Sequence, residues 1–273
     1  MLKRITGPQA LTVVVVAMII AVAGLANFSR AQAPQPPPVR IQVTTIQLKA
    51  DMLTVWEDLQ KNEMIPAQKK TGLPWRHTLA NGATGQGFTR LTIIPLANNA
   101  QLDMPGFITR AISAEANANY NAKLRATILS QRAEIYTLEQ DASLMSNLTA
   151  MPQLQLVQVA SVLPGKGGEF LASMREDYLP NYRKAGVKDY WVWTLNAGGP
   201  GGQRVMVRLL DKYADIDRPA LLQQAGLSQE QQNKIGARRN ATLATPIENE
   251  VYRFIPELSY GLPTGAAAAR ATN

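Results

Sequence analysis

Residues 62–72 read NEMIPAQKKTG, and residues 176–186 read EDYLPNYRKAG. In both stretches a proline stands six residues before a glycine, and a lysine stands two residues before that glycine. Proline removes a helical hydrogen bond, whereas glycine tolerates the left-handed conformation that commonly ends a helix. Each stretch is therefore predicted to close a helix that kinks or breaks at Pro66 or Pro180.

The likeness between these stretches extends over much of the chain. An offset of 114 residues, without a gap, places residues 43–134 over residues 157–248, and seventeen positions are then identical. Gly85 and Gly87 meet Gly199 and Gly201, and further matches are Arg90 with Arg204 and Glu134 with Glu248. Two copies of this length are domain-sized, so the pattern predicts an internal duplication rather than a solenoid.

Each copy is predicted to follow the order β-α-β-β-α-β of a ferredoxin-like unit. Strands are expected at 41–48, 73–80, 88–96 and 134–139 in the first copy, and at 154–163, 188–195, 203–210 and 250–256 in the second. Phe170, Met174 and Tyr178 form an apolar helical stripe, and Ser228 with Gln231 forms a capping box. The predicted fold is α+β, with two four-stranded sheets packed against each other as a pseudo-two-fold barrel.

With this pattern the chain resembles the dimeric α+β barrel superfamily, and within it the NIPSNAP-like proteins. The resemblance rests on the first strand, the helix ending in IPAQKKTG or LPNYRKAG, and the glycine-rich hairpin, over about residues 40–258. It implies that the second copy replaces the partner chain, so a monomer is possible and the oligomeric state stays open. The superfamily includes cofactor-independent monooxygenases and haem enzymes, and fold alone does not choose between functions.

The start of the chain predicts export. Residues 1–33 have a charged start at Lys3 and Arg4, an apolar run over 10–26 and an Ala-Gln-Ala site, as in a signal peptide. The alternative is an uncleaved membrane anchor. We expect a proline-rich leader at 34–39, the first repeat at 40–150, the second at 151–258 and a flexible tail at 259–273. The mature protein is expected in the periplasm or outside the cell, without stable membrane insertion.

The residue inventory excludes several classes of site. The chain has one histidine and no cysteine, which argues against zinc and two-histidine iron sites, and no metal or organic cofactor is expected. The formal charge of +8 is scattered, so a nucleic-acid partner is not expected. GATGQG (82–87) and GGPGG (198–202) are interpreted as hairpin turns. His77 aligns with Trp191 and is expected in the core beneath the helices, which disfavours haem.

The candidate site follows from strand alternation. Leu91, Ile93, Val205 and Val207 are assigned to the helix-covered side, so their neighbours should face the space between the sheets. Those neighbours are mixed, with amides, hydroxyls and several arginines among apolar groups, and a sealed core would not contain so many polar groups. The candidate ligand-binding residues are Arg90, Arg204, Arg208, Arg76, Tyr190, Thr44 and Gln158. The alternative is that the arginines lie at strand ends, paired with carboxylates such as Glu134 and Glu248.

The sequence thus predicts an exported protein that binds a small amphipathic or anionic molecule in a cleft between the repeats. One alternative is a cofactor-independent oxygenase or isomerase in the same cleft, in which Tyr190, Arg90 and Arg204 would bind and polarise the substrate. Another is a structural or partner-binding protein. No catalytic residue can be assigned, because no acid–base pair is recognisable.

Overall fold

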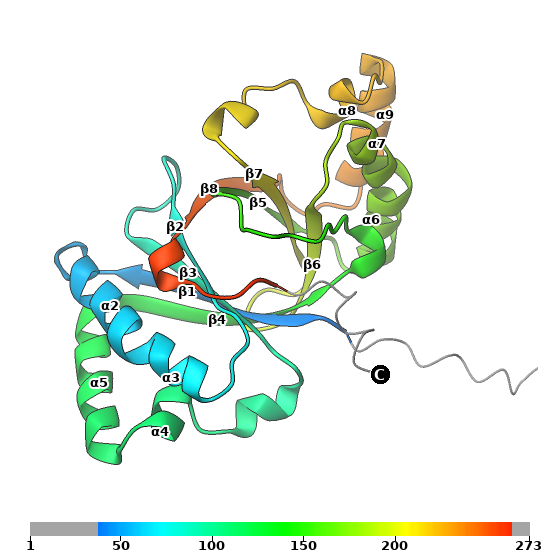
Figure 1. Ribbon diagram of the computed structural model, residues 1–273. Coiled ribbons are helices and arrows are strands. Elements are labelled where there is room, and N and C mark those ends of the chain that lie inside the picture. The colour runs from blue at the N-terminus through cyan, green and yellow to red at the C-terminus, as the bar shows by residue number, and fades with distance from the viewer. Residues whose placement is uncertain (1–37, 264–273) are drawn as a thin grey trace, which may run out of the picture. The chain divides into compact units, whose positions relative to one another are not determined.

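Eight antiparallel strands form one closed barrel in the order β1-β3-β2-β8-β5-β7-β6-β4 (Figure 1). The structure, a computed structural model, describes residues 38–263. The predicted signal peptide, most of the predicted proline-rich leader and most of the predicted tail lie outside the described residues. None of the helices within 38–263 is long and apolar enough to span a bilayer.

The element bounds follow the predicted β-α-β-β-α-β order in each half. The first half contains β1 (Arg40–Leu48), α2 (Leu53–Leu59), a π turn (Gln60–Met64), α3 (Ile65–Lys70), β2 (His77–Asn81), β3 (Thr89–Pro95), α4 (Phe107–Ala111), α5 (Ala114–Thr127) and β4 (Ile128–Leu138). The second half contains β5 (Leu154–Ser161), α6 (Gly167–Ser173), a π turn (Met174–Tyr178), α7 (Leu179–Lys184), β6 (Tyr190–Ala197), β7 (Gln203–Leu210), α8 (Leu221–Gln224), α9 (Gln229–Asn240) and β8 (Glu248–Phe254). Short 3-10 turns occupy Ala50–Met52, Asn99–Asp103, Gln140–Ala142, Tyr213–Asp215 and Pro256–Leu258.

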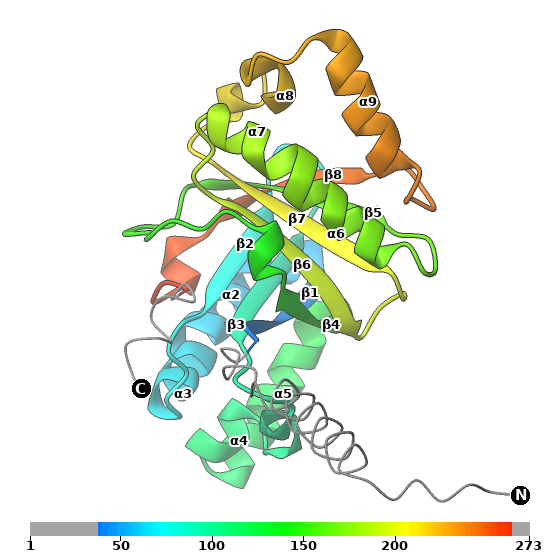
Figure 2. The same cartoon turned by 90° about the vertical axis from the view of Figure 1, so that its right-hand side faces the viewer.

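The two predicted sheets join edge to edge rather than stacking as separate layers. Within each half the strand order is last-first-third-second, and the seams between the halves are β2 with β8 and β4 with β6. Helices α2 to α5 cover the outside of the first half, and α6 to α9 cover the outside of the second (Figures 1 and 2). Closure gives every strand a partner on both sides, although the two seams pair only Leu79–Asn81 with Tyr252–Phe254 and Ile135–Leu138 with β6. This pairing reduces the usual hazard of exposed sheet edges.

Proline explains the π turn that precedes α3 and α7. Pro180 has no N–H to donate to a carbonyl one turn earlier, and the Leu179 N–H instead donates to the Met174 carbonyl, five residues back. Ile65 donates to Gln60 in the same way before Pro66. The helices therefore continue through a π turn instead of breaking. Gly72 and Gly186 end them with φ of +82° and +80°, as the sequence predicts.

The predicted facing of the strands is wrong. Ile93, Val205, Val207, Trp193 and Trp75 belong to clusters that draw apolar side chains from both halves, which places them inside the barrel. The side chains that alternate with these residues along the strands contact the helices. Tyr190, Val192 and Met206 pack with Phe170 and Tyr178 of the second half's helical layer. Both faces of these strands are covered, so alternation alone does not say which face is inside.

His77 is buried, as predicted, but on the inner face rather than beneath the helices. Its ring packs against Trp75 at 5.0 Å and edge-on against Phe254 at 5.4 Å between ring centroids. Its Nε2 lies 3.2 Å from the Gly261 carbonyl oxygen. Burial lowers the pKa of His77, partly opposed by that hydrogen bond. The histidine is therefore a packed, neutral core residue.

The last strands do not follow the gapless offset. Thr44 pairs with Ala133, and its counterpart Gln158 pairs with Asn249, so β8 is displaced by two residues relative to the sequence alignment. The structural counterpart of Glu134 is consequently Glu250, not Glu248. Tyr136 donates to the Glu134 carboxylate and Tyr252 donates to that of Glu250, each two residues along its strand.

The glycine-rich hairpins lie against the last strand of the other half. A Cβ on Gly198, which has φ +93°, would collide with the Ala133 carbonyl oxygen, and one on Gly199 would meet the Glu134 carboxylate. Gly85 of the first half also lies beside Glu250, where a Cβ would be in ordinary contact with the carboxylate at 3.5 Å. These glycines permit close approach at the barrel seams, so the hairpins serve barrel closure.

Candidate functional site

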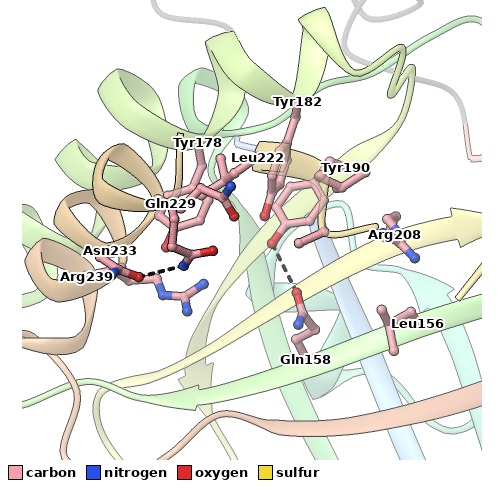
Figure 3. Close-up of a pocket in the computed structure, with 14 residues that line it drawn as sticks. Leu156, Gln158, Tyr178, Tyr182, Tyr190, Arg208, Leu222, Gln229, Asn233 and Arg239 are labelled. Atoms are coloured by element: carbon pink, nitrogen blue, oxygen red, sulfur yellow. Dashed lines mark hydrogen bonds between the residues drawn. The ribbon is translucent and has the colours of Figure 1, made fainter. Parts of the chain in front are cut away.

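A cavity of about 360 Å³ lies between the sheet of the second half and its helices (Figure 3). Strands β5, β6 and β7 supply its floor, and α7, α8 and α9 with the preceding π turn supply its walls. Its lining residues are Leu156, Gln158, Tyr178, Tyr182, Tyr190, Arg208, Ala220, Leu221, Leu222, Gln229, Gln232, Asn233, Gly236 and Arg239. The site is therefore on the outer face of the barrel, whereas the sequence predicts a cleft between the repeats.

Three tyrosines form one side of the cavity. The rings of Tyr178 and Tyr182 meet edge-on at 5.7 Å, and those of Tyr182 and Tyr190 meet at 4.9 Å. Tyr178 ends the π turn and Tyr182 follows four residues later on α7, so both face the sheet. Burial raises the pKa of Tyr182 to about 12 and raises that of Tyr190 well above its ordinary value. All three phenols are neutral hydrogen-bonding groups at neutral pH.

Two arginines place positive charge in the cavity. Arg239 on α9 lies over the Tyr178 ring, with Cζ 4.8 Å from the ring centroid. Arg208 on β7 has one long hydrogen bond, from Nη2 to the Asp215 carbonyl oxygen at 3.5 Å. The Nε atoms of both side chains are buried without a partner among the described residues. No aspartate or glutamate lines the cavity, so these cations are not neutralised there.

Amide groups complete the polar surface. The Tyr190 hydroxyl donates to Gln158 Oε1 at 3.3 Å, and Gln158 Nε2 donates to Asn249 Oδ1 at 2.7 Å. Gln229 Nε2 donates to Asn233 Oδ1 at 2.9 Å on α9. Figure 3 shows Arg208 and Arg239 on opposite sides of the Tyr190–Gln158 pair. The cavity can thus hold an aromatic or aliphatic body while donating hydrogen bonds to an anionic group.

The structure brings together three of the seven predicted residues: Gln158, Tyr190 and Arg208 line the cavity. Arg204 lies on the same sheet but contacts the start of α6, where a Cβ on Gly167 would come within 2.9 Å of its Nη2. Arg76, Arg90 and Thr44 belong to the first half, beneath its own helices.

Arg90 and Arg204 do not form a pair between the sheets, because the inner face holds the apolar set. Arg90 Nη2 forms an ion pair with Glu57 Oε1 of α2 at 3.0 Å. Glu134 pairs instead with Arg132, also at 3.0 Å. The alternative, in which the arginines pair with carboxylates, therefore holds for Arg90. Its partner is Glu57 rather than the predicted Glu134 or Glu248.

The sequence interpretation does not identify Tyr178, Tyr182, Arg239, Gln229 or Asn233 as site residues. Tyr178 and Tyr182 are four residues apart on a predicted helix, a spacing that puts both rings on one face. The same spacing is equally typical of two residues packed in a hydrophobic core. Arg239 comes from a helix far along the chain, and only the packing of α9 over the sheet brings it to the cavity.

The donor set of the cavity does not fit haem. The single histidine of the chain is His77, which lies inside the barrel, and the cavity offers no imidazole, thiolate or thioether. A phenolate ligand is disfavoured, because burial holds the tyrosines protonated. Within residues 38–263 no three histidine, cysteine, aspartate or glutamate side chains are grouped as a metal site.

The closed antiparallel barrel with helices outside both halves is the fold of the dimeric α+β barrel proteins. No protein-family model matches the chain. No curated protein matches it either.

Several solved structures share this fold. A proposed monooxygenase from Lactobacillus acidophilus is 8% identical with a TM-score of 0.52, and covers 80% of this chain and 94% of its own. An anthrone oxidase-like protein is 13% identical with a TM-score of 0.51, covering 81% and 92%. A proposed monooxygenase from Fusobacterium nucleatum is 9% identical with a TM-score of 0.53, covering 82% and 98%. At these identities the likeness concerns the fold alone.

Proposed function

We propose that this protein binds a small anionic or amphipathic molecule in the cavity between the second-half sheet and helices α7 to α9. The observation that carries the proposal is the pair Arg208 and Arg239. Each has a buried Nε without a partner, in a cavity with no carboxylate. Both side chains are half-buried, so each guanidinium loses part of its hydration without gaining a counter-charge, and an anionic ligand group would offset that cost. The tyrosine rings supply the surface for the apolar body.

Binding of aromatic carboxylates tests this function against their uncharged amides. Isothermal titration calorimetry with the full chain is expected to show binding of the acids in preference to the amides. The double variant Arg208→Met/Arg239→Met should lose this preference while keeping its far-UV circular dichroism. Arg183→Met, an exposed change on α7 outside the cavity, is the matched control. Equal binding of acids and amides by the unaltered protein would contradict the proposal.

A cofactor-independent oxygenase or isomerase is the second candidate for the same cavity. Its support is the fold shared with proteins described as monooxygenases and as anthrone oxidase-like. In such a reaction an electron-rich substrate would itself reduce O₂, with Tyr190 and Arg208 holding it and polarising its oxygen. Arg90 and Arg204 cannot take part, because they lie outside the cavity. Oxygen uptake on mixing with phenolic substrates, abolished by Tyr190→Phe, would favour this reading over binding alone.

We also propose that the chain is a tandem duplication of a ferredoxin-like unit and that it is related to the NIPSNAP-like proteins. The recurrence of each π turn, Gln60–Met64 and Met174–Tyr178, at a spacing of 114 residues supports the duplication. The helix-closing stretch with its proline and glycine supports the kinship.

Export to the periplasm or beyond, with cleavage after Ala33, rests on the charged start, apolar run and Ala-Gln-Ala site of residues 1–33. N-terminal sequencing of secreted protein should begin near Pro34. Recovery of intact Met1 in a membrane fraction would favour an anchor.

A further inference from the structure

Arg208 enters the cavity near the start of strand β5. It pairs with Leu156 across the β5–β7 ladder and with Tyr190 across the β6–β7 ladder. Its Nη2 donates to the Asp215 carbonyl oxygen at 3.5 Å. The Asp215 carboxylate is engaged elsewhere, because it lies 3.3 Å from Arg218 Nη2 and accepts from two backbone N–H groups of its own turn. The acidic residue that touches Arg208 therefore does not neutralise it.

Arg239 enters the cavity from the other end of β5. It lies in the last turn of α9, three residues before Thr242, whose carbonyl accepts from the Leu163 N–H at 2.9 Å just beyond the end of β5. The Arg239 guanidinium lies over the Tyr178 ring, with Cζ 4.8 Å from the ring centroid. The two acidic residues that directly precede Tyr178 in the chain both pair with Arg238, at 2.6 and 2.8 Å between nitrogen and oxygen. They are therefore bound to a neighbour of Arg239.

The two guanidinium groups thus approach the cavity from its two ends rather than side by side. Figure 3 shows the hydrogen-bonded pair Tyr190–Gln158 between them. Burial raises the pKa of Tyr182 to about 12, and the charges of Arg208 and Arg239 both oppose this rise. The Tyr182 phenol therefore lies within the electrostatic reach of both cations. A ligand with a single anionic group at either end would leave the other guanidinium without a counter-charge.

We propose, resting on the binding function proposed above, that the ligand is a dianion with one acidic group at each end of an apolar body, as in a linear dicarboxylate. One acidic group binds Arg208 and the other binds Arg239, each through charge-assisted hydrogen bonds from guanidinium N–H groups. The body lies against the tyrosine rings and the leucines that line the cavity. Its size is limited, because a cavity of about 360 Å³ is at the small end of the range for ligand pockets.

Isothermal titration calorimetry with the full chain compares each linear dicarboxylate, from succinate to sebacate, with its own monomethyl ester. The methylene chain lengthens along the series, so one member can match the separation of the two arginines. At that length the dicarboxylate should bind about tenfold tighter than the monoester, equivalent to about 1.4 kcal/mol, because the monoester leaves one guanidinium unpaired. This advantage should pass through a maximum along the series.

Single substitutions test whether each arginine binds one acidic group. In Arg208→Met and in Arg239→Met, the advantage of the dicarboxylate over its monoester should fall to about twofold or less. The monoester should still bind better than the uncharged dimethyl ester, because one arginine remains. Lys234→Met removes an exposed cation of α9 outside the cavity and should retain the full advantage. Far-UV circular dichroism checks the fold of each variant, and the series with the unaltered protein decides the matter if a variant does not fold.

The outcomes separate the dianion from the binding function on which it rests. Monoesters that bind as tightly as dicarboxylates at every length, but more tightly than dimethyl esters, would overturn the dianion and leave the anion-binding function intact. Equal binding of all three kinds of compound would overturn both. Absence of binding by every dicarboxylate would overturn the dianion, while the aromatic carboxylates test the binding function independently. Full retention of the dicarboxylate advantage in either single variant would also overturn it.

Discussion

Replacing Tyr136 with phenylalanine should break a hydrogen-bond network that joins the two halves inside the barrel. The Tyr136 hydroxyl donates to Glu134 Oε2 at 3.0 Å and accepts from Gln203 Nε2 at 2.7 Å. Glu134 and Tyr136 are on β4, whereas Gln203 begins β7 of the second half. Burial and the neighbouring Glu134 carboxylate raise the pKa of Tyr136, so the phenol remains the donor at neutral pH.

The magnitude follows from what the substitution leaves unpaired. A hydrogen bond to a charged group contributes about 1.5–3 kcal/mol, and an unsatisfied buried donor costs about 1–3 kcal/mol. Glu134 keeps its ion pair with Arg132, and Gln203 can relax in part, so we expect a net loss of about 2–4 kcal/mol. For a domain of this size the Tm should fall by roughly 4–16 °C.

The assay is urea and thermal unfolding of the full chain, followed by circular dichroism. Tyr252→Phe is the matched control, because Tyr252 donates to Glu250 and has no second partner like Gln203 among the described residues. It should cost about 1–2 kcal/mol. In the double variant Tyr136→Phe/Gln203→Leu, part of the Tyr136 effect should disappear, because the unpaired amide is gone. A Tyr136→Phe protein within about 0.5 kcal/mol of the unaltered chain, or less affected than Tyr252→Phe, would refute the reasoning.

Three further predictions concern the barrel itself. Gly198→Ala should destabilise by at least about 2 kcal/mol, because its φ is +93° and its Cβ meets the Ala133 carbonyl. Gly201→Ala should be nearly neutral, because no atom lies within 4 Å of its Cβ. Equal urea midpoints for Gly198→Ala and Gly201→Ala would contradict the close approach of Gly198 to β4. Burial lowers the pKa of His77 below its ordinary value of 6.5, so the folded state binds this proton less readily than the unfolded state. The contribution of His77 to the free energy of unfolding should be fully present above that pH and should be lost as the pH drops below it. In His77→Phe, the free energy of unfolding should therefore fall less between pH 6.5 and lower pH. An unchanged pH dependence in this variant would contradict the prediction. Residues 39–150 expressed alone should form a homodimer or aggregate, because β2 and β4 lose their seam partners; a soluble, sharply melting monomer in sedimentation analysis would exclude this.

The locally determined features could be predicted from the sequence. Proline, glycine and capping residues act on their own turn of backbone, which is why the ends of α3 and α7 and the Ser228–Gln231 cap are as expected. The order of elements follows from periodicity and turns. The π turns could have been anticipated only in part, because proline announces a disturbed helix without specifying its form.

Tertiary structure decided which strand face is inside and where the cavity lies. Val205 and Val207 alternate with Arg204, Met206 and Arg208, and this pattern fits either facing when helices cover one side and a barrel interior fills the other. Tyr190, Gln158 and Arg208 could be grouped from the sequence because they share one sheet face. Arg239 joins them only through the packing of α9. Long-range packing therefore set the site, while local chemistry set the elements that build it.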